Sequence, residues 1–234
     1  MRSALGCALR VLAIVCVSLT GPSAPAAAQR DLRRAHEQCI RSVVRITTDS
    51  GHGTGWVTMV GDQKVVVTAQ HVVDQLARVH LSFYDEELMH GDVVWMSARI
   101  DLAVIVPERQ PDVPALPVGS GALIRGERVV LGGNPGGLSF VTTEGVVAGV
   151  LHGSRLSDAA CGEGNNCVIV DAESEPGSSG GPIVDADGRV VGMLWGIYAA
   201  TSLSIGLHAS TLASELLVAD AELTRQRRAR RRAQ

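Results

Sequence analysis

A glycine-flanked serine is the feature of this sequence that most directly suggests chemistry. Ser179 lies in the run Gly-Ser-Ser-Gly-Gly-Pro at residues 177–182, which leads into the apolar residues Ile183 and Val184. Glycines on both sides allow backbone conformations that other residues avoid, and they let a substrate carbonyl come close to main-chain N–H groups. The run predicts a serine nucleophile presented in a turn, although similar runs also occur in ordinary turns and linkers.

A serine hydroxyl becomes a good nucleophile only when a base takes its proton and a third group holds that base. His71 follows the β-branched run at residues 64–68 and is expected just past the end of a strand. Asp101 stands at the head of the apolar run at residues 102–106, where a histidine N–H would satisfy a buried carboxylate. His71 could instead be a simple turn histidine, and Asp101 could cap a strand. The order His, Asp, Ser along the chain excludes the orders found in subtilisins and α/β-hydrolases.

The elements that must position these residues are predicted to be strands. Apolar residues make up 46% of the chain but aromatic residues only 3%, so the core must consist of Val, Leu, Ile and Ala. Valine-rich runs alternate with turns of Gly, Asp and Asn, and there is little helical periodicity before Ser210. This pattern predicts an all-β fold followed by a helix that starts near Ser210 or Thr211. The chain is long enough for one such domain but has no room for a large second one.

The segments around the three candidate residues resemble trypsin-like serine proteases, most closely the high-temperature-requirement (Deg-type) branch. They are Thr-Ala-Gln-His at 68–71, Asp-Leu-Ala-Val-Ile at 101–105, and Asp-Ala at 171–172 followed by Pro-Gly-Ser-Ser-Gly-Gly-Pro at 176–182. Similar to the same branch are Gly-Thr-Gly-Trp-Val at 53–57, Gly-Asn-Pro-Gly-Gly at 133–137 and Val-Thr-Thr-Glu-Gly-Val-Val at 141–147. The resemblance covers about residues 43–217, which is the protease domain only. It implies two six-stranded antiparallel barrels and a secreted serine endopeptidase that forms an acyl-enzyme intermediate.

The resemblance also implies a role for each candidate. His71 and Asp101 would come from the first barrel and Ser179 from the second. The backbone around Gly177, Ser178 and Ser179 would form the oxyanion hole. Leu194, Trp195 and Gly196 look like the strand that pairs with an extended substrate, which suits unfolded or flexible protein segments.

The preference at the cleaved bond is left open by the sequence. Glu173 and Ser174, with Glu175, are the nearest candidates for the walls of the primary pocket. An acidic pocket floor would favour Lys or Arg, whereas solvent-facing carboxylates would leave a small apolar pocket. Relatives of the resembled branch usually prefer small aliphatic residues, but they do not usually carry glutamates here. A second departure is Ser178, which replaces the aspartate that pairs with a new N-terminus in digestive proteases.

The first 28 residues are predicted to be a signal peptide. Arg2 and Arg10 precede the apolar stretch at residues 11–19, and three alanines at 26–28 provide a small-residue cleavage site. The apolar stretch is short for a membrane span, so an uncleaved anchor is the weaker alternative. We therefore expect a secreted or periplasmic protein with a protease domain at residues 29–224 and an Arg-rich tail at residues 225–234.

Export would expose the remaining cysteines to an oxidising compartment. Cys161 and Cys167 are separated by a Gly- and Asn-rich loop long enough to close, so a disulfide between them is predicted, with two free thiols as the alternative. Cys39 is left over and is either buried and free or paired between molecules. No histidine lies at ligand spacing from these cysteines, so no metal and no cofactor are expected.

Charge is distributed unevenly along the chain. Residues 29–224 contain 13 basic and 24 acidic residues, a net charge of −11, whereas six arginines fall within the last ten residues. The tail could contact an anionic membrane surface, nucleic acid or the acidic body, or it could be a solvated helix end. Nucleic acid is the less favoured partner because no aromatic residue interleaves with the arginines. The expected partners are thus polypeptide substrates, with a weak anionic surface contact through the tail.

A different class of function stays open at this point. A protease-fold protein can bind partners without cleaving them if the turn around Ser179 collapses and its amides point away. A third possibility is a processing protease or esterase that acts on one partner in the cell envelope.

Overall fold

The computed structural model describes residues 31–233 except 85–87, 121–122, 153–160, 163 and 199–200. These residues belong to one compact unit that begins at Asp31. The predicted signal peptide lies outside the described residues.

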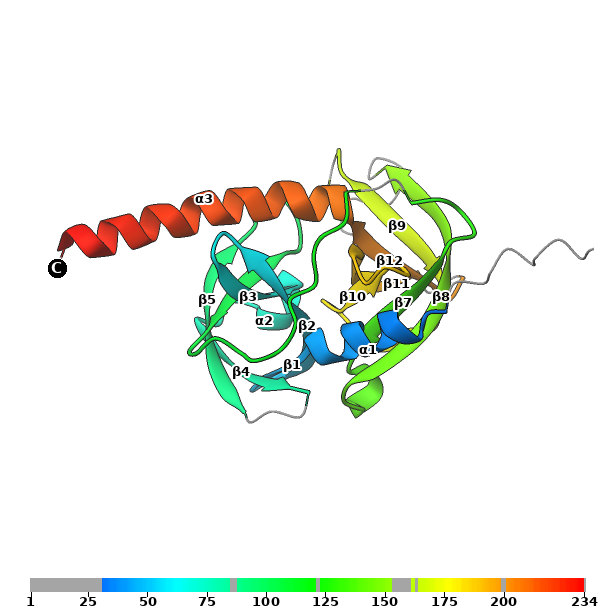
Figure 1. Ribbon diagram of the computed structural model, residues 1–234, viewed down its shortest axis with the longest axis horizontal. Helices are drawn as coiled ribbons and strands as arrows, with labels where there is room; N and C mark the ends of the chain where they lie inside the picture. Colours follow the sequence, from blue (N-terminus) through cyan, green and yellow to red (C-terminus); the bar gives the residue numbers. More distant parts are fainter. Residues whose placement is uncertain are drawn as a thin grey trace, which may run out of the picture. The chain divides into compact units, whose positions relative to one another are not determined.

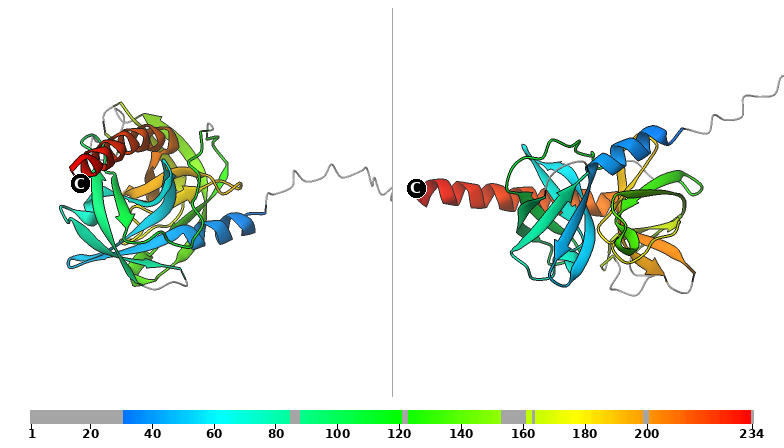
Figure 2. Two further views of the ribbon diagram at one scale, coloured as in Figure 1. Left: turned by 60° about the vertical axis from the view of Figure 1, so that its left-hand side comes forward. Right: turned by 90° about the horizontal axis from the view of Figure 1, so that it is seen from below.

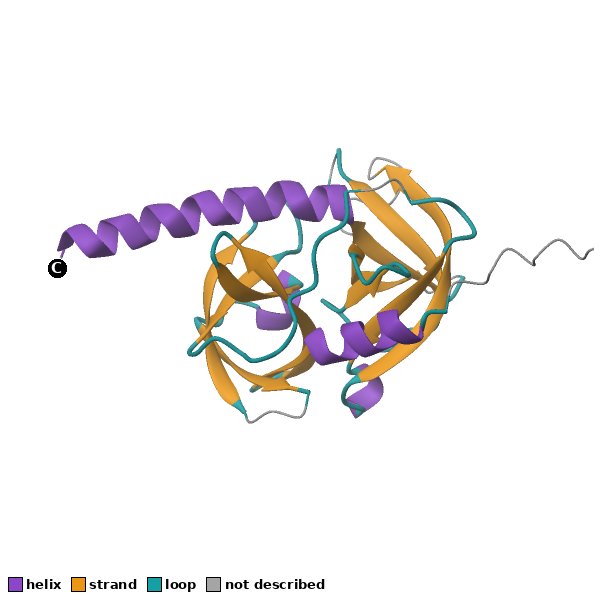
Figure 3. Cartoon of the chain, viewed as in Figure 1, coloured by secondary structure: helices purple, strands orange, loops and turns teal. Residues whose placement is uncertain are grey.

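Two closed antiparallel barrels of six strands each dominate the structure (Figure 1, Figure 3). The first barrel has the strand order β1-β2-β3-β6-β5-β4 and the second the order β10-β11-β12-β9-β8-β7. The first comprises β1 (Val43–Thr48), β2 (Gly51–Val60), β3 (Gln63–Thr68), β4 (Arg78–Phe83), β5 (Met89–Met96) and β6 (Ala103–Pro107). The second comprises β7 (Arg128–Gly133), β8 (Val141–His152), β9 (Asn166–Asp171), β10 (Pro182–Val184), β11 (Val190–Tyr198) and β12 (Leu203–His208). The predicted all-β fold of two six-stranded barrels is therefore confirmed.

The strands follow from the alternation of apolar and polar residues. In β4, Val79, Leu81 and Phe83 are buried, whereas Arg78 and His80 face solvent. Such alternation gives one face to the core and one to water. A short turn joins β2 to β3, and in it Gly61 adopts a left-handed conformation with φ of 61°.

Four helical segments of the described chain complete the fold. They are α1 (Arg33–Ser42), the short α2 (Gln70–Val73), the 3-10 turn η1 (Pro135–Gly137) and α3 (Ala209–Ala233). The sequence showed little helical periodicity before Ser210, so α1 differs from the expectation. Its buried residues Ala35, Cys39 and Ser42 recur at helical spacing, but a stripe this narrow in a charged segment gives only a weak signal.

The C-terminal helix packs against both barrels. It contacts β11 and β12 of the second barrel and β2 and β5 of the first. A stripe of buried apolar side chains recurs every three or four residues, as expected for one helix face, and it includes Leu212, Leu216, Ala219 and Leu223. The helix continues without a break to Ala233, so residues 225–233 of the Arg-rich tail are its last turns (Figure 2).

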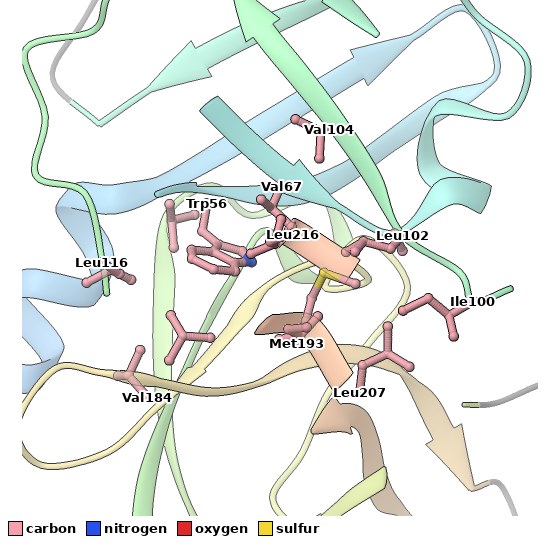
Figure 4. Packing of buried hydrophobic residues seen from close by; sticks show 14 of the residues in the cluster. Trp56, Val67, Ile100, Leu102, Val104, Leu116, Val184, Met193, Leu207 and Leu216 are labelled. Carbon is pink, nitrogen blue, oxygen red and sulfur yellow. The ribbon is translucent and has the colours of Figure 1, made fainter. Parts of the chain in front are cut away.

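The largest group of buried side chains lies between the barrels rather than inside either one. Trp56, Val67 and Leu102 from the first barrel belong to the same cluster as Met193 and Leu207 from the second (Figure 4). Leu216 from α3 joins them, so the helix closes this shared core. Smaller clusters fill the interior of each barrel. Burial of apolar surface therefore holds the barrels together and fixes the segments that face each other across their junction.

None of the helices in the described part of the chain is both long and apolar enough to cross a membrane.

Candidate active site

His71 and Asp101 meet at the ends of two paired strands. His71 lies in α2, directly after β3, and Asp101 lies two residues before β6, which pairs with β3. One oxygen of the Asp101 carboxylate accepts the backbone N–H of His71 at 2.8 Å, and the other is hydrogen-bonded to His71 Nδ1. A carboxylate accepts on both oxygens, so it holds the proton on Nδ1 and leaves Nε2 free to act as a base.

The hydrogen bond to Asp101 raises the pKa of His71 above its ordinary value of 6.5. Burial acts in the opposite direction, because it disfavours the charged imidazolium, and the negative charge of Asp101 adds a smaller upward contribution. The side chain of His71 is 49% exposed, whereas that of Asp101 is only 16% exposed. The imidazole is thus accessible to a substrate while its partner is sheltered.

Ser179 lies in a turn whose backbone requires glycine at two positions. Gly177 and Gly180 have φ values of 99° and 85°, in the left-handed region that other residues avoid. A Cβ on Gly180 would lie 2.1 Å from the carbonyl oxygen of Thr54. The turn therefore brings the serine segment of the second barrel against β2 of the first. In this arrangement Ser179 Oγ donates a hydrogen bond of 3.3 Å to the carbonyl of Trp195.

Two backbone amides of this turn are candidates for an oxyanion hole. The carbonyl of Pro176 accepts the N–H of Gly136 at 2.9 Å, which points the N–H of Gly177 the other way. Within the described residues, the N–H groups of Gly177 and Ser179 have no hydrogen-bond acceptor. The N–H of Ser178 instead donates to the carbonyl of Glu175 at 3.0 Å, so Ser178 shapes the bend rather than offering a donor.

A buried polar network holds the turn from the side of the first barrel. The Thr54 hydroxyl donates to the carbonyl of Gly177 at 2.6 Å and accepts the backbone and side-chain N–H groups of Asn134 at 2.9 and 3.0 Å. The Thr68 hydroxyl donates to the carbonyl of Thr54 at 2.6 Å. Thr54, Thr68 and Asn134 are fully buried, so these bonds are not exchanged for water.

Leu194, Trp195 and Gly196 lie where β11 changes partners. β10 pairs with β11 only as far as Met193, and the ladder between β11 and β12 is irregular between Leu194 and Gly196. Among the described strands, β11 pairs with β12 alone from Trp195 onward. A Cβ on Gly196 would meet nothing within 4 Å, so the space over the face of the strand at this residue is open. Leu194 itself is buried in the second barrel.

Glu173 and Ser174 line a cavity of about 300 Å³ on the other side of the serine turn. Its walls are largely apolar and include Leu131, Val141 and Leu194, and Ser178 lines it from the serine turn. Glu173 and Glu175 are exposed. Trp195 and Gly196 do not line this cavity, so the structure divides the predicted substrate residues between two places.

The predicted disulfide between Cys161 and Cys167 is present. Both cysteines are buried in the core between the barrels, whereas Gly164 in the loop that they close is exposed. Cys39 is free and buried, and burial raises the pKa of its thiol to about 12, so it is an unreactive apolar side chain. In the described part of the chain, no three His, Cys, Asp or Glu side chains gather in a way that could hold a metal ion.

Two sets of residues near the site were not identified from the sequence. Thr54 and Asn134 lie in segments that carried the family resemblance, but nothing local showed that they bond to each other. Glu215 of α3 accepts a hydrogen bond from Ser97 and so supports the loop that contains Asp101. The sequence signal for this contact was a carboxylate beside the apolar stripe of the helix. Both sets join residues at least 80 positions apart, so the sequence alone does not show the contacts.

Comparison with known proteins agrees with this geometry. The trypsin-like peptidase domain family matches residues 53–193, so the chain belongs to that family. It is 32% identical over 168 residues to Protease Do-like 1, chloroplastic, of Arabidopsis thaliana, covering 70% of this chain and 37% of the relative. It is 29% identical over 184 residues to a probable periplasmic serine endoprotease, DegP-like, of Chlamydia pneumoniae, covering 74% of this chain and 36% of the relative. The chain thus spans little more than a third of the length of these relatives.

A solved structure gives the same result for the fold. The Rv3671c protease of M. tuberculosis in an inactive form superimposes with a TM-score of 0.67 at 27% identity, covering 82% of this chain and 94% of that one. The names of these proteins describe a Do-like protease, a DegP-like serine endoprotease and a protease.

Proposed function

We propose that this chain is a serine endopeptidase in which His71, Asp101 and Ser179 act as a catalytic triad. The observation that carries the proposal is the pair of hydrogen bonds that the Asp101 carboxylate accepts from the backbone N–H and the ring Nδ1 of His71. It fixes the imidazole with Nε2 outward, as a general base requires. The free amides of Gly177 and Ser179 support the proposal, because they can stabilise a negative oxygen beside the serine.

The proposed reaction begins when Ser179 Oγ attacks a peptide carbonyl and its proton passes to His71 Nε2. The carbonyl oxygen becomes negative and is bound by the amides of Gly177 and Ser179. The C–N bond then breaks, the proton moves from His71 to the leaving amine, and an ester with Ser179 remains. A water molecule then attacks this ester while His71 takes its proton. The ester bond breaks, the carboxylic acid product leaves, and Ser179 Oγ regains its proton from His71.

Substrate binding would also prepare the nucleophile. The Ser179 hydroxyl donates a hydrogen bond to the carbonyl of Trp195. This carbonyl faces the edge of β11 that β10 leaves unpaired. An extended peptide that pairs with this edge would donate an N–H to the same carbonyl. We therefore propose that substrate releases the hydroxyl to turn toward His71, and that unfolded or flexible segments are cleaved because only they can adopt the strand conformation.

Hydrolysis of an unfolded protein tests the proposed activity. Residues 29–234 should cleave reduced casein, and the Ser179→Ala variant should not. A compact, disulfide-bonded protein of similar size should be cut far more slowly by the same preparation. Equal cleavage by wild type and Ser179→Ala would refute the assignment.

A second candidate function is a protease-fold protein that binds partners without cleaving them. The specific observation in its favour is the hydrogen bond from Ser179 Oγ to Trp195 rather than to His71. This candidate predicts that peptides bind along β11 without being hydrolysed at any pH. Turnover of any peptide that is lost in Ser179→Ala would exclude it.

We further propose that the protein works outside the cytoplasm. The pattern of residues 1–28, the buried disulfide and the periplasmic assignment in the name of the Chlamydia relative support this location. The mass of the protein recovered from the periplasm should correspond to removal of residues 1–28. Recovery of the unprocessed chain from the cytoplasm with free thiols would contradict the proposal.

The end of α3 is proposed to make a weak contact with an anionic membrane surface. Arg225, Arg228, Arg231 and Arg232 are exposed at the end of the helix, whereas the body of the chain is acidic. Arg227 is engaged with Asp62. Vesicles containing phosphatidylglycerol should retain the protein at low salt and release it at high salt, because the attraction is electrostatic. Equal retention after Arg228, Arg231 and Arg232 are changed to Gln would refute this contact.

A further inference from the structure

Glu215 is a buried carboxylate on the face of α3 that packs against the loop before β6. Its side chain is only 4% exposed. One carboxylate oxygen accepts the hydroxyl of Ser97 at 2.6 Å, and the other accepts Nε of Arg99 at 2.9 Å. A second nitrogen of the Arg99 guanidinium also binds that oxygen. Glu222, on the same helix, is bound by Arg225 and Gln226 of that helix and has no hydrogen bond to the loop among the described residues.

Through Ser97, the carboxylate controls the backbone of this loop. A serine hydroxyl has one proton to donate and two lone pairs that accept. The proton of Ser97 goes to Glu215, and the lone pairs accept the backbone N–H groups of Arg99 and Ile100 at 3.1 and 3.2 Å. The negative charge of Glu215 therefore fixes the orientation of the hydroxyl in which both amides are bound.

The amides that Ser97 binds lead directly to Asp101. The loop is closed by hydrogen bonds of 2.9 Å from the N–H of Ser97 to the carbonyl of Leu102 and from the N–H of Leu102 to the carbonyl of Ile100. Ile100 and Leu102 are buried on either side of Asp101. The neighbours on both sides of Asp101 are thus held in place, and its carboxylate accepts hydrogen bonds from His71.

We propose that Glu215 is a positioning residue that sets the hydrogen bond between Asp101 and His71 from the C-terminal helix. This inference rests on the proposed catalytic role of His71 and Asp101. A carboxylate needed only for the packing of α3 would stabilise the fold without changing the protonation of His71. A positioning residue changes both, because a displaced Asp101 no longer holds the imidazole.

The decisive variant is Glu215→Gln, with Glu222→Gln as its matched control on the same helix. A glutamine amide has an oxygen at only one of the two carboxylate positions, so its NH2 group would face either the Ser97 hydroxyl or the Arg99 guanidinium in place of an acceptor. We expect kcat to fall about tenfold or more with little change in KM, since small displacements at catalytic groups have large effects on rate. The His71 resonance, assigned with His71→Gln, should titrate at lower pH than in wild type. Glu222→Gln should leave both quantities unchanged.

The same prediction holds for Ser97→Ala, which removes the hydroxyl with less disturbance and serves if Glu215→Gln is too unstable to purify. Glu215→Asp should restore part of the activity, because it keeps the charge. A folded Glu215→Gln variant with wild-type kcat and an unchanged His71 titration would overturn the proposal. The NMR titration needs no catalysis, so it still reports on the position of Asp101 if Ser179 proves inactive and the proposed function fails.

Discussion

The backbone N–H of Thr54 donates a hydrogen bond of 2.9 Å to the carbonyl of Ser179. This bond joins β2 of the first barrel to the serine turn of the second. The hydroxyl of Thr54 binds the carbonyl of Gly177 two residues earlier, so a single residue fixes both ends of the nucleophile turn. The position of Ser179 relative to the first barrel is therefore set by main chain and by one buried hydroxyl.

Replacing Thr54 with valine should reduce turnover while the protein stays folded. Valine keeps the shape of threonine but removes the acceptor of the backbone N–H and of one side-chain N–H of Asn134, which costs about 1–3 kcal/mol for each group left unpaired. The turn would then be held less firmly, and we expect kcat to fall about tenfold or more, approaching the ~10²–10³-fold loss seen when an oxyanion donor is removed. Thr54→Ser keeps the hydroxyl and should be nearly normal. Equal kcat in Thr54→Val and wild type would show that the network does not hold the site.

Activity should be lost on acidification at a pH above the ordinary histidine range. Asp101 raises the pKa of His71 above 6.5, and only the neutral imidazole can accept the serine proton. The acid limb of kcat/KM should therefore have its midpoint above pH 6.5. Peptide hydrolysis measured from pH 5 to 9 checks this, and a flat profile down to pH 5 would contradict the assignment of His71.

The hydrogen bond between His71 and Asp101 also predicts how the free energy of unfolding depends on pH. A histidine whose pKa is raised on folding stabilises the native state below its unfolded pKa, and this contribution is lost as pH rises through the folded value. Asp101→Asn should therefore destabilise the protein more at pH 5.5 than at pH 9. It should also lower kcat by about 10⁴-fold, as loss of the orienting carboxylate does in other triads. Denaturant unfolding at the two pH values measures the difference, and an equal effect at both would argue against the pairing.

Much of the site could be predicted because its signals are local. The valine-rich runs gave the strands of both barrels, and the glycines around Ser179 showed that the turn needs left-handed backbone. His71 follows a strand and Asp101 precedes one, so their closeness depends on how β3 and β6 pair. That pairing came from the family resemblance and not from the residues alone.

What could not be predicted depends on contacts between distant segments. Glu215 and Ser97 are separated by 118 positions, and an acidic residue in a helix is usually a solvated one. Helix α1 lies in a charged segment, and its stability comes from packing Ala35 and Cys39 against the second barrel. The burial of Cys161 and Cys167 between the barrels likewise depends on distant segments, and the Gly- and Asn-rich loop between them does not signal it.

Loss of the disulfide should destabilise the second barrel. The bridge closes a loop with a sequence separation of 6, and the chain-entropy treatment gives about 2 kcal/mol for a loop of this size. The variant with Cys161→Ser and Cys167→Ser should melt about 4–8 °C lower. Cys39→Ser, which changes a buried free thiol, serves as a comparison that leaves the bridge intact. An unchanged melting temperature in the double variant would show that the bridge does not contribute.

Substrates with an apolar residue before the cleaved bond should be preferred. The cavity beside the serine turn has apolar walls, and Glu173 and Glu175 are exposed rather than placed at its floor. Peptides with Val or Leu at that position should be cleaved faster than matched peptides with Lys or Arg. Mass spectrometry of the products from a peptide mixture measures the preference. Dominant cleavage after Lys or Arg that is abolished by Glu173→Gln would contradict the predicted apolar preference.

The central claim is that Ser179 is a nucleophile activated by His71, and covalent labelling tests it most directly. Purified residues 29–234 would be treated with a fluorophosphonate, and the adduct located by mass spectrometry in wild type, Ser179→Ala and His71→Ala. We predict a single adduct on Ser179 that is lost in both variants. A well-folded wild-type protein that forms no adduct, or one that is labelled equally after His71→Ala, would contradict the claim.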